Sequence, residues 1–234
     1  MSKCIIIPDV HLKPWMFDEA EKILDVTVFD FIVCLGDLVD DWNQEVNLNL
    51  YADTLDRCLD FVKQHENVLW CYGNHDVSYI WQRPETGYSS FARQTVLEHF
   101  NPLEWYLSGK ISFIHRMDNV LFSHAGLTTE FVEEWCDDIK DDVDAIVDRI
   151  NGFGSGQLWR DNSPIWARPQ YGHFEMFPEN MLQVVGHTPM EIAECEGNVL
   201  SLDTFSTYRD GTPIGNQRFV WVDTETMEWG YADE

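Results

Sequence analysis

Apolar and polar positions alternate along the first third of the chain in blocks of two kinds. Short continuous apolar runs have the length of buried strands. Longer stretches between them repeat their apolar residues about every 3.6 positions, as an amphipathic helix does. The expected strands are residues 4–7, 31–35 and 68–72, and the expected helices are residues 16–28 and 47–65. Strands that alternate with helices in this way predict βαβ units and a parallel sheet.

The second half of the chain has a different pattern, in which strands tend to follow one another. We expect neighbouring strands at residues 111–114 and 120–123 with a turn at 117–119, an acidic helix at 129–150, a buried run at 182–185, and antiparallel strands within 199–231 that include the hairpin VDTETMEW. No linker, repeat or low-complexity segment divides the chain. The prediction is an α/β protein with a single domain over residues 1–234, in which two sheets pack face to face with helices outside.

The charge of the chain is strongly negative. It has 15 Lys and Arg residues against 41 Asp and Glu residues, which gives a formal net charge of −26. A protein that binds many phosphates needs clustered basic residues, because counterion release drives that binding. The sequence contains no basic cluster, so a nucleic-acid-binding module is not expected.

The sequence also lacks the features of a membrane or secreted protein. No stretch approaches the roughly 18–20 consecutive apolar residues of a membrane span. The first residues, MSKCIIIPDVHLKPW, have too short an apolar segment for a signal peptide, and Asp9 interrupts it. The six cysteines are not spaced for a thiolate zinc site, and we expect them to be reduced and buried. A cytoplasmic location without a membrane partner is the simplest expectation.

Side chains that can do chemistry follow five of the apolar runs. In open α/β sheets, ligands bind at the carboxyl ends of the strands, so the residues after each run are candidates for a site. They are Asp9 and His11, Asp37 and Asp40, Asn74 and His75, His124, and His187. Three of the five segments have a glycine just before the polar residue, which lets the backbone turn sharply and another group approach closely.

Taken singly, each of these residues has an ordinary structural explanation. A buried Asp can cap a helix, and an isolated His is more often a packing residue than a ligand. Together, carboxylate, imidazole and amide groups without thiolate form a ligand set suited to divalent Mn, Fe, Zn or Ni. The set exceeds the four ligands of a tetrahedral zinc site and matches two metal ions that share a carboxylate.

The five segments also form an ordered series of motifs. Asp-X-His at 9–11, Gly-Asp-X-X-Asp at 36–40, Gly-Asn-His-Asp at 73–76, Ser-His-Ala-Gly at 123–126 and Gly-His-Thr at 186–188 follow in this order. The series resembles the signature of the calcineurin-like metallophosphoesterases. Its last two motifs resemble the branch that contains the phosphoprotein phosphatases and the symmetrical diadenosine tetraphosphatases. The resemblance implies a four-layer αββα sandwich of two mixed β-sheets flanked by helices.

The resemblance also implies a role for each of these side chains. Two divalent metal ions, with manganese as the first candidate, would be held by Asp9, His11 and Asp37 on one side and by Asp37, Asn74, His124 and His187 on the other. Pro189 stands where much of the wider superfamily has another histidine, so the first ion would have fewer protein ligands. His75 would protonate the leaving oxygen, and Asp40 would orient His75. A hydroxide between the ions would attack phosphorus.

One position departs from the pattern of the phosphoprotein phosphatases. Their Gly-Asp-X-Val-Asp-Arg-Gly reads Gly-Asp-Leu-Val-Asp-Asp-Trp here, so Asp41 replaces an arginine that binds the substrate phosphate. We expect Arg160 or Arg168, in the segment LWRDNSPIWARP, to bind the phosphate instead. We also expect Asp41 to repel the phosphate, so that Asp41→Arg would improve activity.

The sequence therefore predicts a dinuclear-metal phosphatase for phosphomonoesters of a small molecule or of a Ser/Thr phosphoprotein. Hydrolysis of dinucleoside polyphosphates is the alternative, and a nuclease is disfavoured by the net charge of −26. A non-catalytic scaffold with this fold would be expected to lose metal ligands, and here every expected ligand type is present. The sequence does not indicate the substrate or the oligomeric state. Residues 77–110 and 152–180 are expected to shape the pocket.

Overall fold

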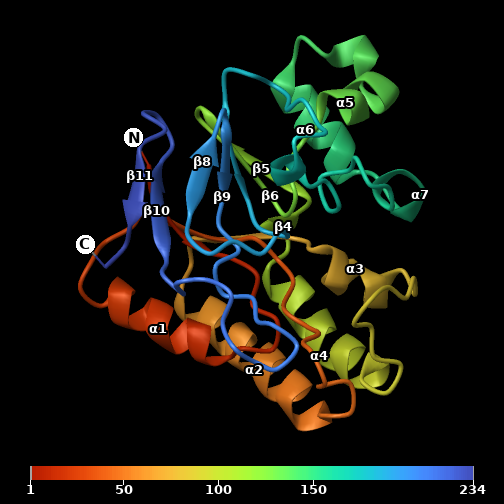
Figure 1. Cartoon of the computed structure of the whole chain (residues 1–234), viewed down its shortest axis with the longest axis vertical. Helices are drawn as coiled ribbons and strands as arrows, with labels where there is room; N and C mark the ends of the chain where they lie inside the picture. The colour runs from red at the N-terminus through yellow and green to blue at the C-terminus, as the bar shows by residue number, and fades with distance from the viewer. Residues whose placement is uncertain (1, 234) are drawn as a thin grey trace.

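Two mixed β-sheets lie at the centre of the computed structural model, which describes residues 2–233 (Figure 1). The first sheet has the order β11-β10-β1-β2-β3-β4, with β1 at Lys3–Ile7, β2 at Phe31–Cys34, β3 at Val68–Cys71, β4 at Ile111–Ser112, β10 at Val220–Asp223 and β11 at Trp229–Tyr231. The second has the order β5-β6-β7-β9-β8, with β5 at Ile114–Met117, β6 at Val120–Ser123, β7 at Leu182–Val185, β8 at Glu194–Glu196 and β9 at Val199–Ser201. Strands β1, β2 and β3 are parallel, as the βαβ pattern predicts.

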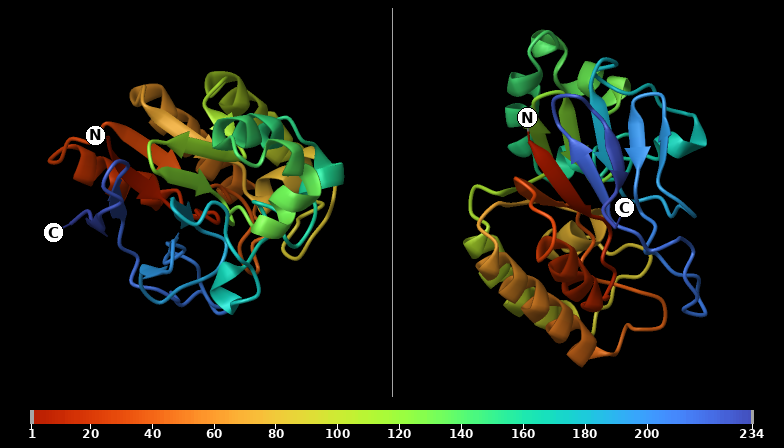
Figure 2. Two further views of the ribbon diagram at one scale, coloured as in Figure 1. Left: turned by 90° about the horizontal axis from the view of Figure 1, so that it is seen from above. Right: turned by 90° about the vertical axis from the view of Figure 1, so that its left-hand side faces the viewer.

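Seven α-helices and two short 3₁₀ helices surround the sheets within residues 2–233. The α-helices are α1 Trp15–Leu24, α2 Leu48–Gln64, α3 Asn74–Ile80, α4 Arg93–Tyr106, α5 Thr129–Trp135, α6 Val143–Asn151 and α7 Ser155–Leu158, and the 3₁₀ helices are Asp137–Ile139 and Pro169–Tyr171. Helices α1, α2 and α4 lie together on one side of the molecule, and α5 and α6 lie at the opposite end (Figures 1 and 2).

Alternating side chains along the strands produce three apolar layers. Ile5 and Ile7 of β1 face one way and pack in a cluster with residues of α1, α2 and α4. Cys4 and Ile6 face the other way and pack against the second sheet. The outer face of that sheet, which includes Leu121, packs against α5 and α6. The order helices, sheet, sheet, helices is the four-layer αββα sandwich that the sequence predicts.

The chain passes from the first sheet to the second at Phe113, and here the structure corrects the sequence prediction. One strand is predicted over residues 111–114, but β4 pairs with β3 of the first sheet and β5 pairs with β6 of the second. Asn151 of α6 holds this crossing, because its Oδ1 accepts the backbone N–H groups of Phe113 and Ile114 at 3.0 Å. A distant side chain therefore divides the run, which the pattern along the run does not reveal.

Three further segments also differ from the prediction. The expected helix over residues 129–150 is divided, because Oδ1 of Asp142 accepts the N–H of Ala145 at 3.1 Å and caps α6 as a new helix. Within the expected antiparallel tail, β9 pairs parallel with β7, although the hairpin of β10 and β11 is confirmed. Residues 85–87 of the expected pocket segment at 77–110 line the main cavity, as predicted, but residues 93–106 form helix α4, which packs against α2.

No helix within residues 2–233 is long and apolar enough to cross a bilayer. The six cysteines are free, and five of them are buried. Cys195 is exposed, which corrects the expectation that all six are buried. It lies on β8, the edge strand of the second sheet, whose three residues are all exposed.

Candidate metal centre

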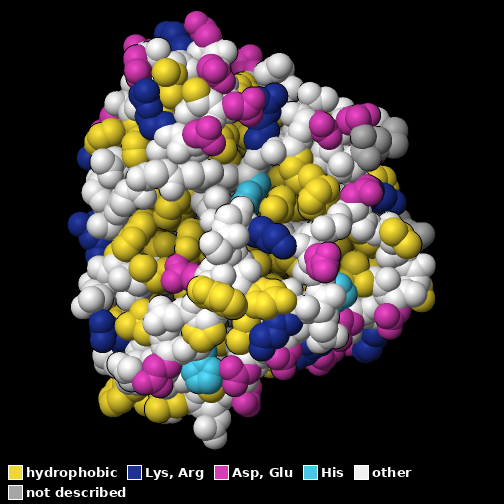
Figure 3. All heavy atoms as spheres, turned by 180° about the vertical axis from the view of Figure 1, so that it is seen from behind, with side chains coloured by type: hydrophobic (Ala, Val, Ile, Leu, Met, Phe, Trp, Pro, Cys, Tyr) yellow, Lys and Arg dark blue, Asp and Glu magenta, His cyan; other side chains and the backbone are white. Residues whose placement is uncertain are grey.

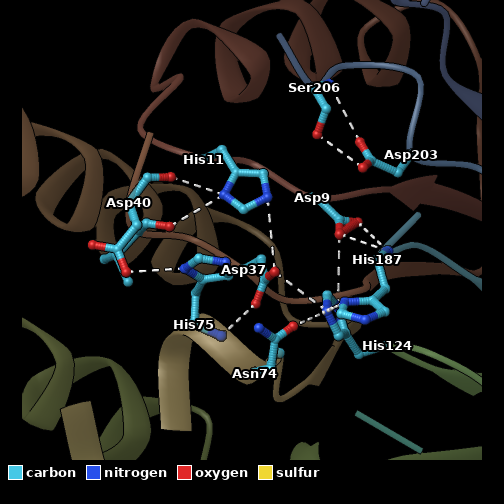
Figure 4. A network of polar contacts seen from close by, with 12 residues as sticks. Asp9, His11, Asp37, Asp40, Asn74, His75, His124, His187, Asp203 and Ser206 are labelled. Carbon is cyan, nitrogen blue, oxygen red and sulfur yellow. Dashed lines mark hydrogen bonds and ion pairs between the residues drawn. The ribbon is translucent and has the colours of Figure 1, made fainter. Parts of the chain in front are cut away.

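Five strand ends from the two sheets meet at one place (Figure 4). Asp9 follows β1, Asp37 follows β2 and Asn74 follows β3, all at the carboxyl end of the first sheet. His124 follows β6 and His187 follows β7 of the second sheet. Figure 4 shows their side chains pointing toward one another, so the structure brings together residues that lie as many as 178 positions apart in the chain.

Two glycines permit this close approach of the strand ends. A Cβ atom at Gly73 would lie 2.0 Å from Oδ1 of Asp37, and one at Gly186 would lie 2.0 Å from Oδ2 of Asp9. These distances are far shorter than a van der Waals contact, so any larger residue would displace the carboxylate. The absence of a side chain at each glycine therefore leaves room for a carboxylate from the end of another strand.

The backbone is strained at four of the candidate residues. His11, Asp37, Asp40 and His187 have φ angles of 44°, 48°, 66° and 63°. Non-glycine residues rarely adopt this left-handed region, and each one costs about 1–3 kcal/mol where the surrounding structure holds it there. Such strain tends to cluster at functional sites, where the backbone aims side chains in directions that regular structure does not provide.

Backbone carbonyl groups fix the orientation of two imidazole rings. Nδ1 of His124 lies 2.8 Å from the carbonyl oxygen of Leu35, and Nδ1 of His11 lies 2.8 Å from that of Asp40. A carbonyl oxygen only accepts hydrogen bonds, so Nδ1 carries the proton in both rings. In the neutral rings, the two Nε2 atoms then present lone pairs to the site, which is the form of histidine that binds a metal ion.

These lone pairs face other acceptor atoms at short distance. Nε2 of His124 lies 2.9 Å from Oδ1 of Asn74 and 3.1 Å from Nδ1 of His187. Oδ2 of Asp37 lies 3.2 Å from Nε2 of His124 and 3.7 Å from Nε2 of His11. Acceptor atoms that converge in this way repel one another unless a proton or a metal ion lies among them. The residues therefore fit divalent ions on the two sides of the Asp37 carboxylate, which lies between both groups in Figure 4.

The charges in the site also favour a bound cation. Burial disfavours the charged form of His124, but the carboxylates of Asp37 and Asp9 raise its pKa to about 9. Without a metal ion, Nε2 of His124 therefore carries a proton, which a bound ion would displace. Burial and then the nearby charge of Asp203 raise the pKa of Asp9 well above its usual value. Burial and the charge of His124 lower the pKa of His187, so this ring is neutral and able to bind a metal ion. Buried carboxylates keep their charge only beside a positive charge, which divalent ions would supply.

Asp40 holds the ring of His75 at the edge of the site. Oδ2 of Asp40 lies 3.0 Å from Nδ1 of His75. Its Oδ1 accepts hydrogen bonds from the hydroxyl groups of Tyr51 and Tyr79 at 2.7 Å and 2.5 Å. Burial opposes a positive charge on His75, but Asp37 and the hydrogen bond to Asp40 raise its pKa to about 10. The contact between Nδ1 and the carboxylate of Asp40 therefore fixes the orientation of the His75 ring.

The other nitrogen of His75 is near the metal-ligand candidates. One ligand atom each from His11, Asp37 and His75 lie within 4.8 Å of one another. Geometry alone therefore allows His75 either to bind a metal ion or to exchange a proton with a bound molecule. The hydrogen bond to Asp40 favours the second role, because a carboxylate partner keeps the ring in one orientation and supports its charged form.

Sequence reasoning missed Glu85, which lies in the irregular segment after α3. Both of its carboxylate oxygens accept hydrogen bonds from Nδ2 of Asn74 at 2.8 Å, and Oε1 lies 3.4 Å from Nδ1 of His75. These bonds fix the amide so that Oδ1 of Asn74 faces His124. Burial is the main reason that the pKa of Glu85 rises to about 7. No sequence signal marks Glu85, since no motif includes it.

Asp76 caps the start of helix α3 and also binds the backbone of another strand end. Oδ2 of Asp76 accepts the backbone N–H of Gly73 at 3.0 Å, as the third residue of the helix. Its two oxygens also accept the N–H groups of Asp37 and Leu38, both at 2.9 Å. Asp76 therefore holds the strained backbone at Asp37 in place from the neighbouring strand end.

The site opens onto a cavity of about 770 Å³, which brings one of the two predicted arginines close to it. Arg168 lines the cavity, and its Nη1 donates to the carbonyl oxygen of His187 at 3.0 Å and to Oγ1 of Thr188 at 3.2 Å. Arg160 does not line the cavity. It pairs with Glu134 at 3.1 Å, and its guanidinium lies over the ring of Trp135. The structure thus places Arg168, and not Arg160, beside the candidate metal ligands.

Comparison with known families agrees with this geometry. The family model described as calcineurin-like phosphoesterase matches residues 2–207, which include all five strand ends of the site. The chain belongs to this family. No curated protein matches the chain.

Solved structures similar to this calcineurin-like phosphoesterase include several phosphatases. A mutant of a cold-active protein tyrosine phosphatase has 16% identity and a TM-score of 0.59, over 99% of this chain and 80% of that one. The cold-active enzyme of a psychrophilic Shewanella species has 16% identity and a TM-score of 0.54 over the same shares. A protein serine/threonine phosphatase from Saccharomyces cerevisiae has 15% identity and a TM-score of 0.52, over 94% of this chain and 72% of that one. At these identities, the similarity concerns the fold.

In this calcineurin-like phosphoesterase, Asp41 lies beside a lysine. Nζ of Lys13 is 3.2 Å from Oδ2 of Asp41 and donates to the carbonyl oxygen of His11 at 3.0 Å. The side chain of Lys13 is buried, so its charge acts at close range and offsets that of Asp41. The expectation that Asp41 repels the substrate phosphate therefore does not fit these contacts.

Proposed function

We propose that the protein is a phosphatase that hydrolyses phosphomonoesters, with a phosphorylated small molecule or a Ser/Thr phosphoprotein as substrate. The observation that carries the proposal is the convergence of the Nε2 atoms of His11 and His124 on the carboxylate of Asp37. Membership of the calcineurin-like phosphoesterase family supports a phosphoester as the substrate. When bound, two divalent ions would supply an activated water and positive charge for the phosphoryl oxygens.

Each of the two ions would have its own ligands from this chain. Asp9, His11 and Asp37 would hold one ion, and Asp37, Asn74, His124 and His187 would hold the other. Asp9 also accepts the backbone N–H of His187 at 2.8 Å, which connects the two sets. Oxygen and nitrogen donors without thiolate suit manganese, with iron, zinc or nickel as alternatives.

Other residues of the chain would act on the substrate itself. His75, held by Asp40 at 3.0 Å, would donate a proton to the leaving oxygen. Arg168 would bind phosphoryl oxygens. Its Nη1 donates to His187 and Thr188, and among residues 2–233 no partner is found for the other N–H groups of the guanidinium, which could therefore bind a ligand in the cavity.

Removal and return of metal ions tests the proposal. Chelation should abolish the hydrolysis of an aryl phosphate, and Mn²⁺ should be among the ions that restore it, because the ions would activate the attacking water. Elemental analysis of the restored protein should find about two ions per chain. Full hydrolysis by the metal-free protein would exclude the proposed centre.

The size of the cavity favours one second candidate, a hydrolase of dinucleoside polyphosphates. A volume of about 770 Å³ is larger than a phosphate group needs and lies within the usual range for drug-sized ligands. Trp42 and Trp166 also line the cavity and could stack on a base. Comparison of kcat/KM for aryl phosphates, phosphopeptides and dinucleoside polyphosphates distinguishes the two candidates.

A nuclease and a non-catalytic scaffold have less support. On the face that Figure 3 shows, the described Lys and Arg side chains are interspersed with Asp and Glu and form no continuous basic surface. A nuclease needs such a surface to bind a polyanion. A scaffold has no need for metal ligands, yet all six ligand positions carry side chains that can bind a metal ion.

A further inference from the structure

Two segments that lie far apart in the chain join to form one part of the cavity wall. Oγ1 of Thr207 donates to Oδ1 of Asp41 at 3.1 Å, and Nε1 of Trp42 donates to the carbonyl oxygen of Thr207 at 3.0 Å. Nδ2 of Asn43 donates to the carbonyl oxygen of Arg209 at 2.9 Å. These bonds hold the backbone around Arg209 against the segment that follows β2.

The negative charge of Asp41 in this wall is offset by the positive charge of Lys13. Asp41 pairs with the buried Lys13 at 3.2 Å while it accepts the hydrogen bond from Thr207. The pair is close to neutral as a unit, so Asp41 can hold Thr207 in place without giving the wall a net negative charge. Asp41 is therefore a positioning residue for the segment that carries Arg209.

Arg209 adds a positive charge to the same wall. Its guanidinium carbon lies 5.8 Å from the ring centroid of Trp42, and both residues line the cavity. Within residues 2–233, no carboxylate forms an ion pair with Arg209, whereas ion pairs with acids are present at Arg57, Arg149 and Arg218. Acidic residues outnumber basic ones by 41 to 15. A guanidinium left without a carboxylate in this cavity is therefore available to an anionic ligand.

We propose that Arg209 and Trp42 form a subsite for a second anionic group on the leaving part of the substrate, either a carboxylate or a second phosphate. The inference rests on the proposed phosphatase function. Arg168 lies beside His187 and would bind the reacting phosphate, which leaves Arg209 for the second anion. A guanidinium makes charge-assisted, often bidentate hydrogen bonds to either anion. Glu45 lines the same cavity, so a cationic leaving group is the competing arrangement.

Matched pairs of aryl phosphates test the subsite in the metal-loaded protein. One member of each pair carries a para carboxylate, and the other carries the neutral primary amide of the same shape. In the three pairs this group is attached directly to the ring, through one methylene group or through two, so that the distance between the ring and the second anion varies. The ratio of kcat/KM for acid over amide within a pair then reports the contribution of the second anion.

For at least one spacer, the acid should exceed the amide about tenfold, the low end of the contribution of a hydrogen bond to a charged group. The ratio should fall toward one in Arg209→Gln, which keeps a polar side chain without the charge. Arg83→Gln is the matched control, because Arg83 also lies 5.8 Å from a tryptophan ring, that of Trp159, and does not line this cavity. Arg168→Gln should lower kcat/KM for acid and amide alike.

Each other outcome overturns one of the two proposals. A ratio near one for every spacer, or a ratio that Arg209→Gln leaves unchanged, would exclude the subsite while the phosphatase function stands. A preference for the amide would exclude it in favour of repulsion from Glu45. Failure of the metal-loaded protein to hydrolyse any of the compounds would instead overturn the proposed phosphatase function.

Discussion

Asp37 and His75 lie side by side in the site, yet their replacement should have different consequences. Oδ2 of Asp37 faces Nε2 of His11 on one side and Nε2 of His124 on the other, so Asp37→Asn should lower bound metal and hydrolysis together. His75→Ala should keep the ions and lose about 10²–10⁴-fold in kcat, the usual contribution of a positioned general acid. The loss should be smaller for p-nitrophenyl phosphate, whose leaving group needs no proton. Elemental analysis and kinetics on two substrates measure both effects.

The metal content of His75→Ala is the decisive measurement, because a ligand atom of His75 lies within 4.8 Å of those of His11 and Asp37. A loss of metal equal to that of Asp37→Asn would make His75 a ligand and not an acid. Asp40→Asn is the matched variant for orientation. It keeps an oxygen for Tyr51 and Tyr79 but weakens the hold on His75, so kcat should fall while the metal content is retained.

Asp41→Arg, which the sequence pattern alone would favour, should harm the protein. The substitution would put a second cation beside the buried Lys13 and remove the acceptor for Thr207. Loss of the partner of a buried charge costs about 1–3 kcal/mol or more. Urea unfolding should show that decrease in the free energy of unfolding, and kcat/KM should fall. Asp41→Asn, which keeps an oxygen for Thr207, should be the milder variant. A more active and equally stable Asp41→Arg would contradict this account.

The residues that the sequence identifies differ in kind from those it misses. The ligand candidates and Asp40 directly follow apolar strands, and the ends of such strands are where ligands of α/β sheets bind. Glu85, Lys13 and Arg209 come from segments without periodicity, and their place in the site depends on contacts with distant parts of the chain. Arg160 and Arg168 are only eight positions apart, but just one lines the cavity. Single-sequence reasoning has no means of separating them.

At the scale of the elements, the turn between β7 and the loop that follows depends on Gly186. Gly186→Ala should displace the carboxylate of Asp9, because the new Cβ would lie 2.0 Å from Oδ2. Overpacking of this kind costs about 1–3 kcal/mol, and metal affinity should fall with the displaced ligand. Calorimetry of metal binding and urea unfolding measure the two effects. Gly156→Ala in α7 is the control, since its Cβ would contact nothing within 4 Å. Unchanged metal affinity in Gly186→Ala would contradict the packing described here.

Elements whose local pattern and tertiary contacts agree are well predicted from the sequence. Strands β1, β2 and β3 and helix α2 are of this kind, because buried runs and amphipathic spacing follow directly from the layers. The division of residues 111–114 between two sheets depends on Asn151, and the start of α6 depends on the cap at Asp142. Each of these two features depends on one polar side chain, and hydropathy does not distinguish that side chain from its polar neighbours.

At the scale of the whole molecule, bound metal ions would join the two sheets. Asp9, Asp37 and Asn74 extend from the first sheet, and His124 and His187 extend from the second. A ligand at 100 times its Kd stabilises the folded state by about 2.7 kcal/mol per site. At about 2–4 °C per kcal/mol for a chain of this size, chelation should lower Tm by about 5–10 °C per ion.

Differential scanning calorimetry with and without chelator measures this shift in Tm. Asp37→Asn provides the control, because its weakened centre should leave little difference between the two conditions. Equal Tm values for the loaded and the metal-free wild-type protein would show that the two sheets gain no stability from the centre.

The left-handed backbone at His11, Asp37, Asp40 and His187 has a consequence for how this protein can evolve. Glycine adopts these φ angles without strain, so replacement by glycine could relieve about 1–3 kcal/mol at each position while it removes the functional side chain. At Asp37 and Asp40 this gain is offset, because their carboxylates accept buried hydrogen bonds that glycine would leave unmade. In a lineage released from selection for catalysis and metal binding, His11 and His187 are therefore the positions expected to change to glycine first.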